Sequence, residues 1–144
     1  MQLQLRRSKS FFRSGFTLIE ILVVITIIGL IVAYAATKIF EKGDEAKSRL
    51  AKVQIAEIGG QLDLMKLDVG RYPTTSEGLK ALLQNPGGMN NWTGPYVQKE
   101  EQIKDPWSRD FVYASPGQRG AYDLVSLGAD SKEGGDGPNR DVSN

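Results

Sequence analysis

The chain has 144 residues, with 18 Lys and Arg, 17 Asp and Glu, and neither Cys nor His. The absence of Cys and His excludes disulfides, thiol catalysis, His-assisted nucleophiles and Cys/His zinc sites. Four basic residues lie in the first 15 positions, so the rest carries 14 basic and 17 acidic side chains, a net charge of −3. Nucleic-acid binding is not expected from such a surface, because phosphate recognition requires clustered Lys and Arg.

An apolar segment follows the basic leader. Residues 21–37 are 17 consecutive uncharged residues, and Glu20 stands as a single charge at their start. The 25 residues from Phe16 to Phe40 would form a helix of about 37 Å, enough to cross the hydrocarbon layer with some tilt. A carboxylate at the mouth of this helix costs about 2.5–3.5 kcal/mol in lipid unless it has a partner.

Three interpretations of this segment are open. A secretory signal peptide explains the leader and Ala33-Tyr34-Ala35 as a cleavage sequence, but the apolar run is long for one and Glu20 has no role in it. A plain signal anchor explains the length, with the basic leader retained in the cytoplasm. The third interpretation follows from the residues around Gly15.

The sequence Arg13-Ser-Gly-Phe-Thr-Leu-Ile-Glu20 resembles the processing site of type IV pilin precursors. The resemblance implies that a prepilin peptidase cleaves between Gly15 and Phe16 and that Phe16 is then N-methylated. We expect Glu20 to pair with the new ammonium group of Phe16, in the same chain or a neighbouring subunit, at a helix end whose dipole favours an anion. A buried pair of this kind sets registry more than it adds stability.

Beyond Phe40 the pattern predicts an amphipathic helix. Its apolar residues recur at spacings of three to five and are expected to face the core of a small domain: Ala46, Leu50, Val53, Ile58, Leu62 and Met65. We expect one helix from about Phe16 to Leu67, with bends or partial unwinding at Gly29, Gly43 and Gly59-Gly60. Gly70 and Pro73 end it.

The remaining segments predict short elements. Residues 74–83 predict a capped helix that turns Leu79, Leu82 and Leu83 inward, and residues 85–95 an irregular loop. Three strands are expected, at Gly94–Val97, Asp110–Ala114 and Ala121–Ser126. The aromatic residues are expected in the core or as loop anchors: Trp92, Tyr96, Trp107, Phe111, Tyr113 and Tyr122.

The segment from Ser126 to Val142 is rich in Asp and Gly. Carboxylate and carbonyl oxygens on a flexible, Gly-rich loop suit Ca²⁺, which takes about 6–8 oxygen ligands in proteins. The spacing is not that of an EF-hand, because Lys132 and Gly134 fall where acids belong when Asp130 is position one. Composition alone favours a solvated acidic tail.

The chain as a whole resembles the G-type pseudopilins of type II secretion systems. The resemblance rests on blocks that stand in the family's order: Lys66–Thr75, Glu77–Leu82, Gly94–Tyr96, Asp105–Trp107 and Tyr122–Asp130. It implies an α+β fold of the type IV pilin kind, in which a long N-terminal helix packs on a small antiparallel sheet with a C-terminal calcium-binding loop. The expected organisation is a removed leader at 1–15, a transmembrane or filament-core helix at 16–40 and a periplasmic globular domain at 41–144.

The resemblance also implies one structural Ca²⁺. Its implied ligands are the carbonyl of Leu127 and the carboxylates of Asp130 and Asp141, and spacing adds Asp136. Arg140 departs from the family pattern, because it is a cation where a small or acidic residue is expected.

The function that the resemblance implies is structural. The precursor would cross the bacterial inner membrane once, with its N-terminus cytoplasmic and its domain periplasmic, and then polymerise into a helical filament that drives export of folded proteins across the outer membrane. The implied partners are other copies of the chain, minor pseudopilins, the prepilin peptidase, an inner-membrane assembly platform with its ATPase, and lipid before assembly.

Two alternatives remain. A type IVa pilin for adhesion, twitching or DNA uptake usually has a disulfide-bounded C-terminal loop, whereas this chain has no Cys. A membrane-anchored periplasmic enzyme would need acid–base groups in a pocket, whereas the carboxylates here cluster in the tail without His or Cys to assist them. We expect no enzymatic activity.

Overall fold

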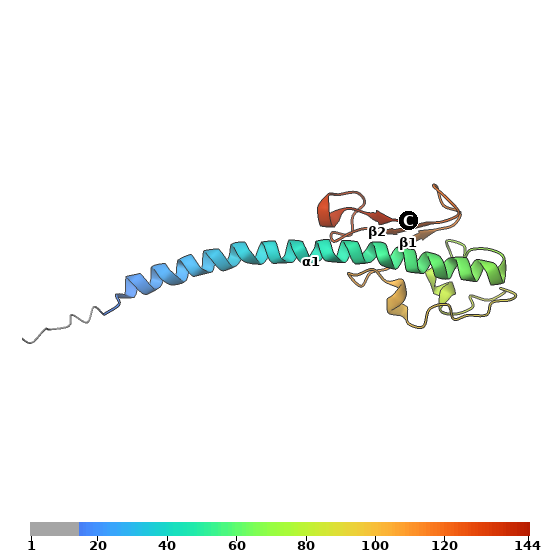
Figure 1. Ribbon diagram of the computed structural model, residues 1–144, viewed down its shortest axis with the longest axis horizontal. Helices are drawn as coiled ribbons and strands as arrows, with labels where there is room; N and C mark the ends of the chain where they lie inside the picture. The colour runs from blue at the N-terminus through green and yellow to red at the C-terminus, as the bar shows by residue number, and fades with distance from the viewer. Residues whose placement is uncertain (1–14) are drawn as a thin grey trace, which may run out of the picture. The chain divides into compact units, whose positions relative to one another are not determined.

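A single long helix dominates the computed structural model, which describes residues 15–144 (Figure 1). Helix α1, Leu18–Val69, belongs to both units into which the chain divides; the described part of the first ends at Lys38, and the second is Ile39–Asn144. The predicted helix is confirmed to within two residues at each end. It is unbroken at Gly29, Gly43 and Gly59-Gly60, so the predicted unwinding at these glycines is wrong.

The helix ends where the sequence predicts. Gly70 has a φ of 86°, and its N–H donates to the carbonyl of Lys66 at 2.8 Å. This left-handed conformation closes the helix and is favoured by Gly, which has no Cβ to clash.

The first unit contains an exposed apolar helix. All described residues from Gly15 to Ala35 are exposed. An 18-residue window of α1 has a mean hydropathy of 2.7 with no residue buried, so this part is long and apolar enough to cross a membrane. A helix that is apolar all round and has no protein cover is typical of a membrane span.

The second unit contains a three-stranded antiparallel sheet in the order β1-β2-β3. The strands are β1, Val112–Ala114, β2, Asp123–Ser126, and β3, Val142–Ser143. In the register, Tyr113 pairs with Leu124 and Val125 pairs with Ser143.

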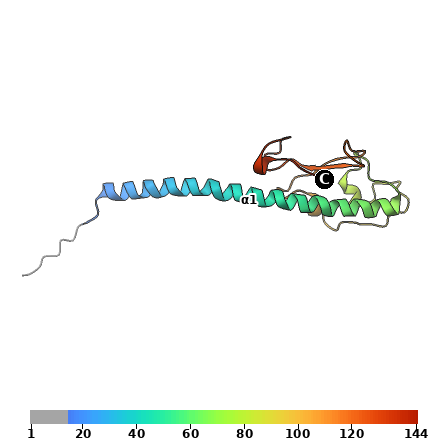
Figure 2. The ribbon, with the colours of Figure 1, turned by 45° about the horizontal axis from the view of Figure 1, so that its top comes forward.

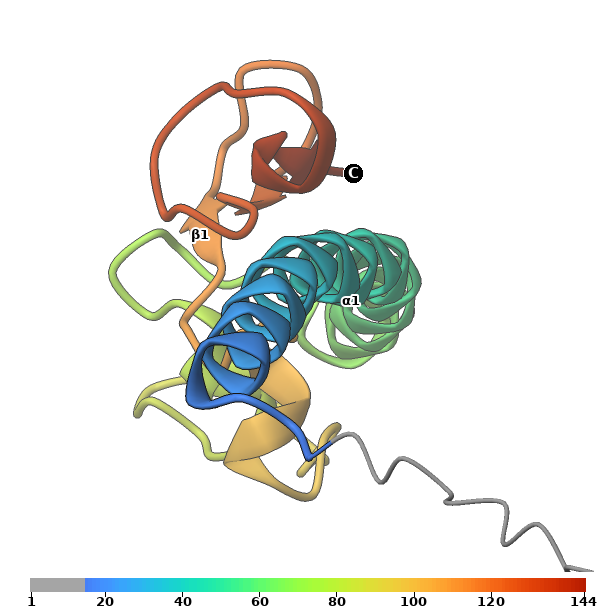
Figure 3. The same cartoon turned by 90° about the vertical axis from the view of Figure 1, so that its left-hand side faces the viewer.

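Three 3-10 turns complete this unit: η1, Leu79–Leu82, η2, Glu100–Ile103, and η3, Gly137–Asn139. Figure 3, which looks along α1, shows the strands on one side of the helix and η2 on another. The second half of α1 therefore lies between two groups of segments, both of which cover it.

The core-facing side of α1 differs partly from the prediction. Ile58, Leu62 and Met65 are buried as predicted, together with Ala51 and Ile55. Ala46, Leu50 and Val53 are exposed, so their predicted burial is wrong. The buried positions 51, 55, 58, 62 and 65 follow the helical period, whereas 46, 50 and 53 belong to the opposite face at about 100° per residue.

The predictions for the short elements are confirmed only in part. Residues 74–83 form turns followed by η1 rather than one capped helix, although Leu79 and Leu82 are buried. The predicted strands at 110–114 and 121–126 correspond to β1 and β2. The predicted strand Gly94–Val97 is wrong, because the N–H groups of Tyr96 and Val97 bond to the carbonyl of Leu82 and not to a strand.

The aromatic residues occupy the predicted environments. Phe111 and Tyr113 are buried in the core, and Trp92, Tyr96 and Tyr122 pack against it. β3 and η2 lie in segments for which the sequence pattern predicts no element.

Candidate functional site

The carboxylate of Glu20 has a partner within its own helix. Thr17 donates to Glu20 Oε2 through its backbone N–H at 2.8 Å and its hydroxyl at 2.9 Å. The N–H of Glu20 donates back to Thr17 Oγ1 at 3.2 Å. This is a capping box, in which each side chain satisfies a free N–H group of the first helical turn. The spacing Thr-x-x-Glu is a sequence signal for this box, whereas the partner predicted for Glu20 was the amine of Phe16.

Gly15 and Phe16 lie just before the helix and are accessible. Both are exposed and non-helical, and Phe16 is 83% exposed. Phe16, Glu20 and neighbouring apolar side chains line one shallow groove, whose other residues are Ile19, Val23 and Val24. Phe16 and Glu20 therefore share one face of the helix start. Arg13 and the rest of the basic leader lie outside the described residues.

A second apolar surface lies on the exposed side of α1. We call it the outer stripe: Leu50, Val53, Leu64 and Leu67, which are 49%, 53%, 50% and 81% exposed. These positions are 3, 11 and 3 residues apart, close to whole numbers of helical turns, so they lie on the helix face opposite the core, with the exposed Glu57 and Gly60 between the two pairs. Exposed apolar side chains gathered on one face are a candidate interaction surface.

The predicted calcium ligands are spread along the C-terminal loop. Asp130 is exposed and its Oδ1 accepts the N–H of Lys132 at 3.2 Å. Asp136 has a fully exposed side chain, 3.9 Å from Arg140. Asp141 accepts the N–H of Gly134 at 2.9 Å. Leu127 and Asp141 line the same surface groove.

The donor set fits a cation in part. Asp141 Oδ1 is buried without a hydrogen-bond partner, which is the arrangement expected of an oxygen kept for a ligand. Glu133, which is not among the predicted ligands, lines the groove with Leu127 and Asp141. Within residues 15–144 no three acidic side chains are gathered in a way that could hold a metal. Asp130 and Asp136 would therefore have to approach Asp141 for the predicted set to bind one ion.

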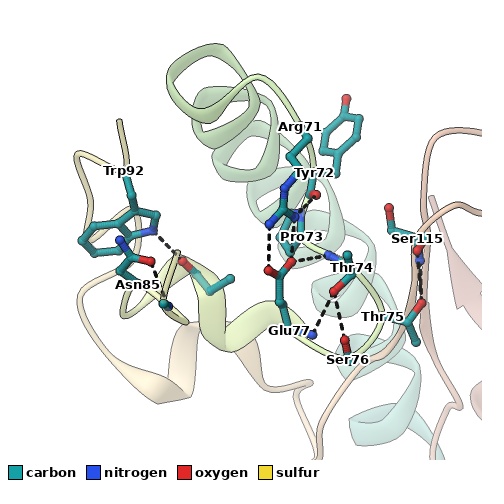
Figure 4. A network of polar contacts seen from close by, with 12 residues as sticks. Arg71, Tyr72, Pro73, Thr74, Thr75, Ser76, Glu77, Asn85, Trp92 and Ser115 are labelled. Atoms are coloured by element: carbon teal, nitrogen blue, oxygen red, sulfur yellow. Dashed lines mark hydrogen bonds and ion pairs between the residues drawn. The ribbon is translucent and has the colours of Figure 1, made fainter. Parts of the chain in front are cut away.

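The block Arg71–Glu77 forms a polar clamp just after α1 (Figure 4). Arg71 donates to both carboxylate oxygens of Glu77, at 2.7 and 2.8 Å. Thr74 adds its N–H to Glu77 Oε2 at 2.7 Å. The hydrogen bonds from Arg71, with help from Thr74, lower the pKa of Glu77 to about 2. Pro73 is joined to the sheet, because its carbonyl accepts the hydroxyl of Tyr113 at 2.8 Å.

Comparison with known families gives two matches along the chain. Residues 38–144 match the family described as type II secretion system (T2SS), protein G. Residues 12–36 match the prokaryotic N-terminal methylation motif. The second match includes Gly15, Phe16 and Glu20, the residues assigned to processing and assembly.

Similar proteins support both matches. The chain is 42% identical over 135 residues to the type II secretion system core protein G of Pseudomonas aeruginosa, covering 92% of this chain and 94% of that protein. It is 38% identical over 135 residues to the protein of the same name from Vibrio cholerae, covering 92% and 91%. The crystal structure of the major pseudopilin from the type 2 secretion system of enterohaemorrhagic Escherichia coli matches with a TM-score of 0.59 at 30% identity, covering 72% of this chain and 90% of that one.

Proposed function

This chain belongs to the family of type II secretion system protein G, and we propose that it is the subunit of a filament built from copies of itself in that system. The membership confirms the resemblance inferred from the sequence and favours a secretion subunit over a type IVa pilin. It also favours a structural role over an enzymatic one, since the solved relative is a major pseudopilin.

The observation that carries the proposal is the start of α1. An exposed, non-helical Gly15-Phe16 bond precedes a helix that is apolar and unburied. We infer that a prepilin peptidase cuts this bond on the cytoplasmic side and that Phe16 is then N-methylated. Cutting here removes residues 1–15 and leaves the apolar helix attached, whereas a signal peptidase would remove it.

The same helix supports a membrane-anchored precursor. Residues 16–40 would cross the bacterial inner membrane once, with the basic leader held in the cytoplasm and residues 41–144 in the periplasm. The capping box of Thr17 and Glu20 lowers the cost of placing this carboxylate near lipid, because its charge is met by two donors of the same turn.

Assembly would exchange lipid contacts for helix–helix contacts. In the processed chain the new amine of Phe16 offers Glu20 a charged partner, on its own chain or on a neighbour. The two residues line one groove, which supports such a pair on one face of the helix start. The outer stripe would extend the same helix–helix contact into the globular unit, because it gives α1 an apolar face that the sheet does not cover.

Further partners follow from this role. The filament would grow on an inner-membrane platform with its ATPase, contain minor pseudopilins, and drive export of folded proteins across the outer membrane. Since the chain outside its leader carries a net charge of −3, we assign it no nucleic-acid partner.

We also propose one structural Ca²⁺ in the C-terminal loop. The buried, unpartnered Oδ1 of Asp141 supports it, and Leu127 lines the same groove. The ligands would be the Leu127 carbonyl with Asp130 and Asp141, joined by Asp136 when the loop closes. Bound Ca²⁺ would offset the mutual repulsion of these carboxylates and close a loop that is otherwise entropically loose.

The proposal is tested by the intact mass of the protein extracted from membranes. Loss of residues 1–15 with one added methyl group is expected. Loss of residues 1–35 would identify a signal peptide instead and end the proposal. The Glu20→Ala variant separates processing from assembly. We expect its intact mass to show the same shortened chain in the membrane, and we expect this chain to be absent from filaments. Normal filaments from this variant would contradict the role of Glu20.

A further inference from the structure

The part of α1 that follows the apolar stretch has little protein support. Among residues 39–50, all of which the structure describes, every residue except Asp44 and Ser48 is exposed. The first buried apolar side chain of the helix is that of Ala51. Gly43 lies within this segment, and a Gly costs a helix about 1 kcal/mol relative to Ala. Helix in water without tertiary contacts is marginal, so contacts with the rest of the globular unit matter for this segment. Asp44, Ser48 and Lys47 make such contacts, the last with its ammonium group 6.0 Å from the Trp107 ring centroid.

Asp44 and Ser48 are hydrogen-bonded to the rest of the globular unit. Trp107 donates its indole N–H to Asp44 Oδ1 at 3.0 Å. The hydroxyl of Ser48 is shared between two carbonyls, that of Asp44 in the same helix at 3.1 Å and that of Pro138, in η3 of the C-terminal loop, at 3.4 Å. Asp44 and Ser48 are four residues apart and therefore share one helix face. In Figure 2 the red turn of η3 lies beside α1, in agreement with this contact.

The Trp107 side chain is in turn held by a cation that reaches the same loop. The Arg109 guanidinium lies 5.4 Å from the Trp107 ring centroid. Arg109 donates to the carbonyls of Gly128 and Ala129, directly before Asp130. The N–H of Ala129 donates to the carbonyl of Pro138 at 3.0 Å, so the residue that Arg109 contacts is linked to the residue that Ser48 contacts.

A buried carboxylate fixes this cation. Asp105 is 5% exposed, and its Oδ2 lies 3.5 Å from Arg109 Nη2. Asp105 also accepts the N–H groups of Trp107 and Arg109, at 3.0 and 2.9 Å, and the hydroxyl of Ser126 at 3.0 Å. The position of Arg109 is thus set by the core and by the two carbonyls at the start of the loop.

We propose that Arg109 and Trp107 form a latch through which order in the loop 127–141 determines how stable α1 is between Phe40 and Leu50. The loop acts on the helix through two contacts, Arg109–Trp107–Asp44 and Pro138–Ser48. When the loop is ordered both contacts hold the segment. When the loop is disordered, the carbonyls of Gly128 and Ala129 no longer hold Arg109, and Pro138 leaves Ser48.

This inference rests on the proposed function in one respect, which is that Ca²⁺ binding to the loop 127–141 orders that loop. Calcium would then regulate a helix segment that contains none of its ligands. The segment directly follows the apolar stretch in the sequence, so the latch would link the metal state of the domain to the part of the helix that leaves the membrane. The contacts of the latch themselves require no metal.

The test is hydrogen exchange of the full chain in detergent, followed by mass spectrometry of peptides covering residues 41–50. Arg109→Lys keeps the charge but loses the planar group that stacks on Trp107 and bonds two carbonyls. We expect exchange in this segment to become about tenfold faster, the factor expected for loss of one strong contact. Arg49→Lys is the matched control, because Arg49 lies in the same segment with a side chain that is 79% exposed, and its exchange should be unchanged.

Two further measurements guard against a general loss of structure. Peptides covering Ile58–Met65 report the core and should keep their protection in Arg109→Lys. Ser48→Ala removes the second contact without touching the core, and because Ala itself favours a helix more than Ser does, faster exchange in residues 41–50 of this variant reports the lost contact. Equal exchange in Arg109→Lys and Arg49→Lys would overturn the latch.

Calcium provides the second arm. In the unmodified chain we expect Ca²⁺ to slow exchange in both 127–141 and 41–50, and in Arg109→Lys to slow it in 127–141 with a much smaller effect in 41–50. Protection of the loop with no change in 41–50 would overturn the inference while the calcium proposal stood. If neither Ca²⁺ nor EGTA changes exchange in residues 127–141, the calcium proposal alone is overturned. The latch is still decided by comparing exchange in residues 41–50 between the variants without metal.

Discussion

The hydroxyl oxygen of Tyr122 lies 2.9 Å from the position that a Cβ atom on Gly59 would occupy. Gly59 is buried, and Tyr122 packs edge-on against Tyr72 with ring centroids 5.0 Å apart. The absence of a side chain at this point of α1 therefore lets the segment leading into β2 approach the helix. The sequence suggested Gly59-Gly60 as a weak point, and the structure shows a packing role for the first of the pair.

The two glycines give a matched pair of substitutions. Gly59→Ala should be less stable than Gly60→Ala by about 1–3 kcal/mol, because both gain helix propensity but only the methyl group at 59 displaces the packed Tyr122 side chain, whose hydroxyl it meets. Gly60→Ala meets open space and should stabilise by about 0.5–1 kcal/mol, the usual gain from replacing Gly in a helix. Thermal unfolding measures both. A Gly59→Ala protein as stable as Gly60→Ala would show that Tyr122 can move without cost.

The clamp between Arg71 and Glu77 predicts a stability that depends on pH. The pKa of Glu77 falls from 4.5 to about 2, chiefly through the hydrogen bonds of Arg71. Because the folded state lowers this pKa, the stabilisation is complete above the unfolded value of 4.5 and is lost as the pH falls toward 2. At pH 7 Glu77→Gln should cost about 1–2 kcal/mol, because hydrogen bonds to a charged group contribute about 1.5–3 kcal/mol and solvent screening at the half-exposed Arg71 reduces this.

Denaturant unfolding at pH 7 and pH 3 measures this effect. The gap in unfolding free energy between the parent chain and Glu77→Gln should shrink at pH 3. Glu101→Gln is the control, because Glu101 is exposed and outside the clamp. A gap that is the same at both pH values would show that the charge of Glu77 does not stabilise the fold.

The calcium proposal predicts a melting temperature that depends on metal. EGTA should lower the melting temperature of the parent chain, since a ligand that binds only the folded state stabilises it. Asp141→Asn should melt like the chelated protein and no longer respond to EGTA, because it loses the charge of the carboxylate whose Oδ1 is buried without a partner. Asp110→Asn, on a residue with a side chain that is 79% exposed, should respond like the parent. An unchanged melting temperature of the parent chain in EGTA would rule the metal out.

The outer stripe predicts a defect in assembly without a defect in folding. Leu64 and Val112 are both 50% exposed, the first on the stripe and the second on β1. Either residue changed to Ser should leave the free energy of unfolding within about 0.5 kcal/mol, because exposed side chains contribute little to the core. Only Leu64→Ser should reduce the number of filaments seen by electron microscopy. Filaments that are lost equally in both variants, or in neither, would remove the stripe from the assembly surface.

Much of the architecture follows from local patterns. The helix could be predicted from Phe16 to Leu67 because apolar residues continue without a Pro, and its end from Gly70, the residue best suited to a left-handed cap. β1 and β2 could be found from short apolar runs between Gly and Pro turns. These features depend on residues that are neighbours in the sequence, so they can be predicted from the sequence alone.

The failures have a different cause. Ala46, Leu50 and Val53 continue an apolar pattern, but two apolar faces share this helix and the sequence does not say which one the sheet covers. The two-residue β3 exists because β2 offers a free edge, which is a contact between distant residues. At the site, the resemblance and the spacing pointed to Glu20 and the loop carboxylates, and the Thr17–Glu20 spacing is itself readable in the sequence. The buried Oδ1 of Asp141 required the structure, because its burial depends on residues distant in the sequence.

The short strand β3 has a consequence for handling the protein. Val142 and Ser143 cover one edge of β2, and Asn144 bonds to both main-chain groups of Leu124, at 2.8 and 3.2 Å. Proteolysis that removes these residues would leave one edge of β2 unpaired, while β1 stays on the other edge. Such an edge recruits strands from other molecules. Proteolysed preparations would then aggregate by pairing of exposed sheet edges. These aggregates should be separated from filaments before assembly is measured.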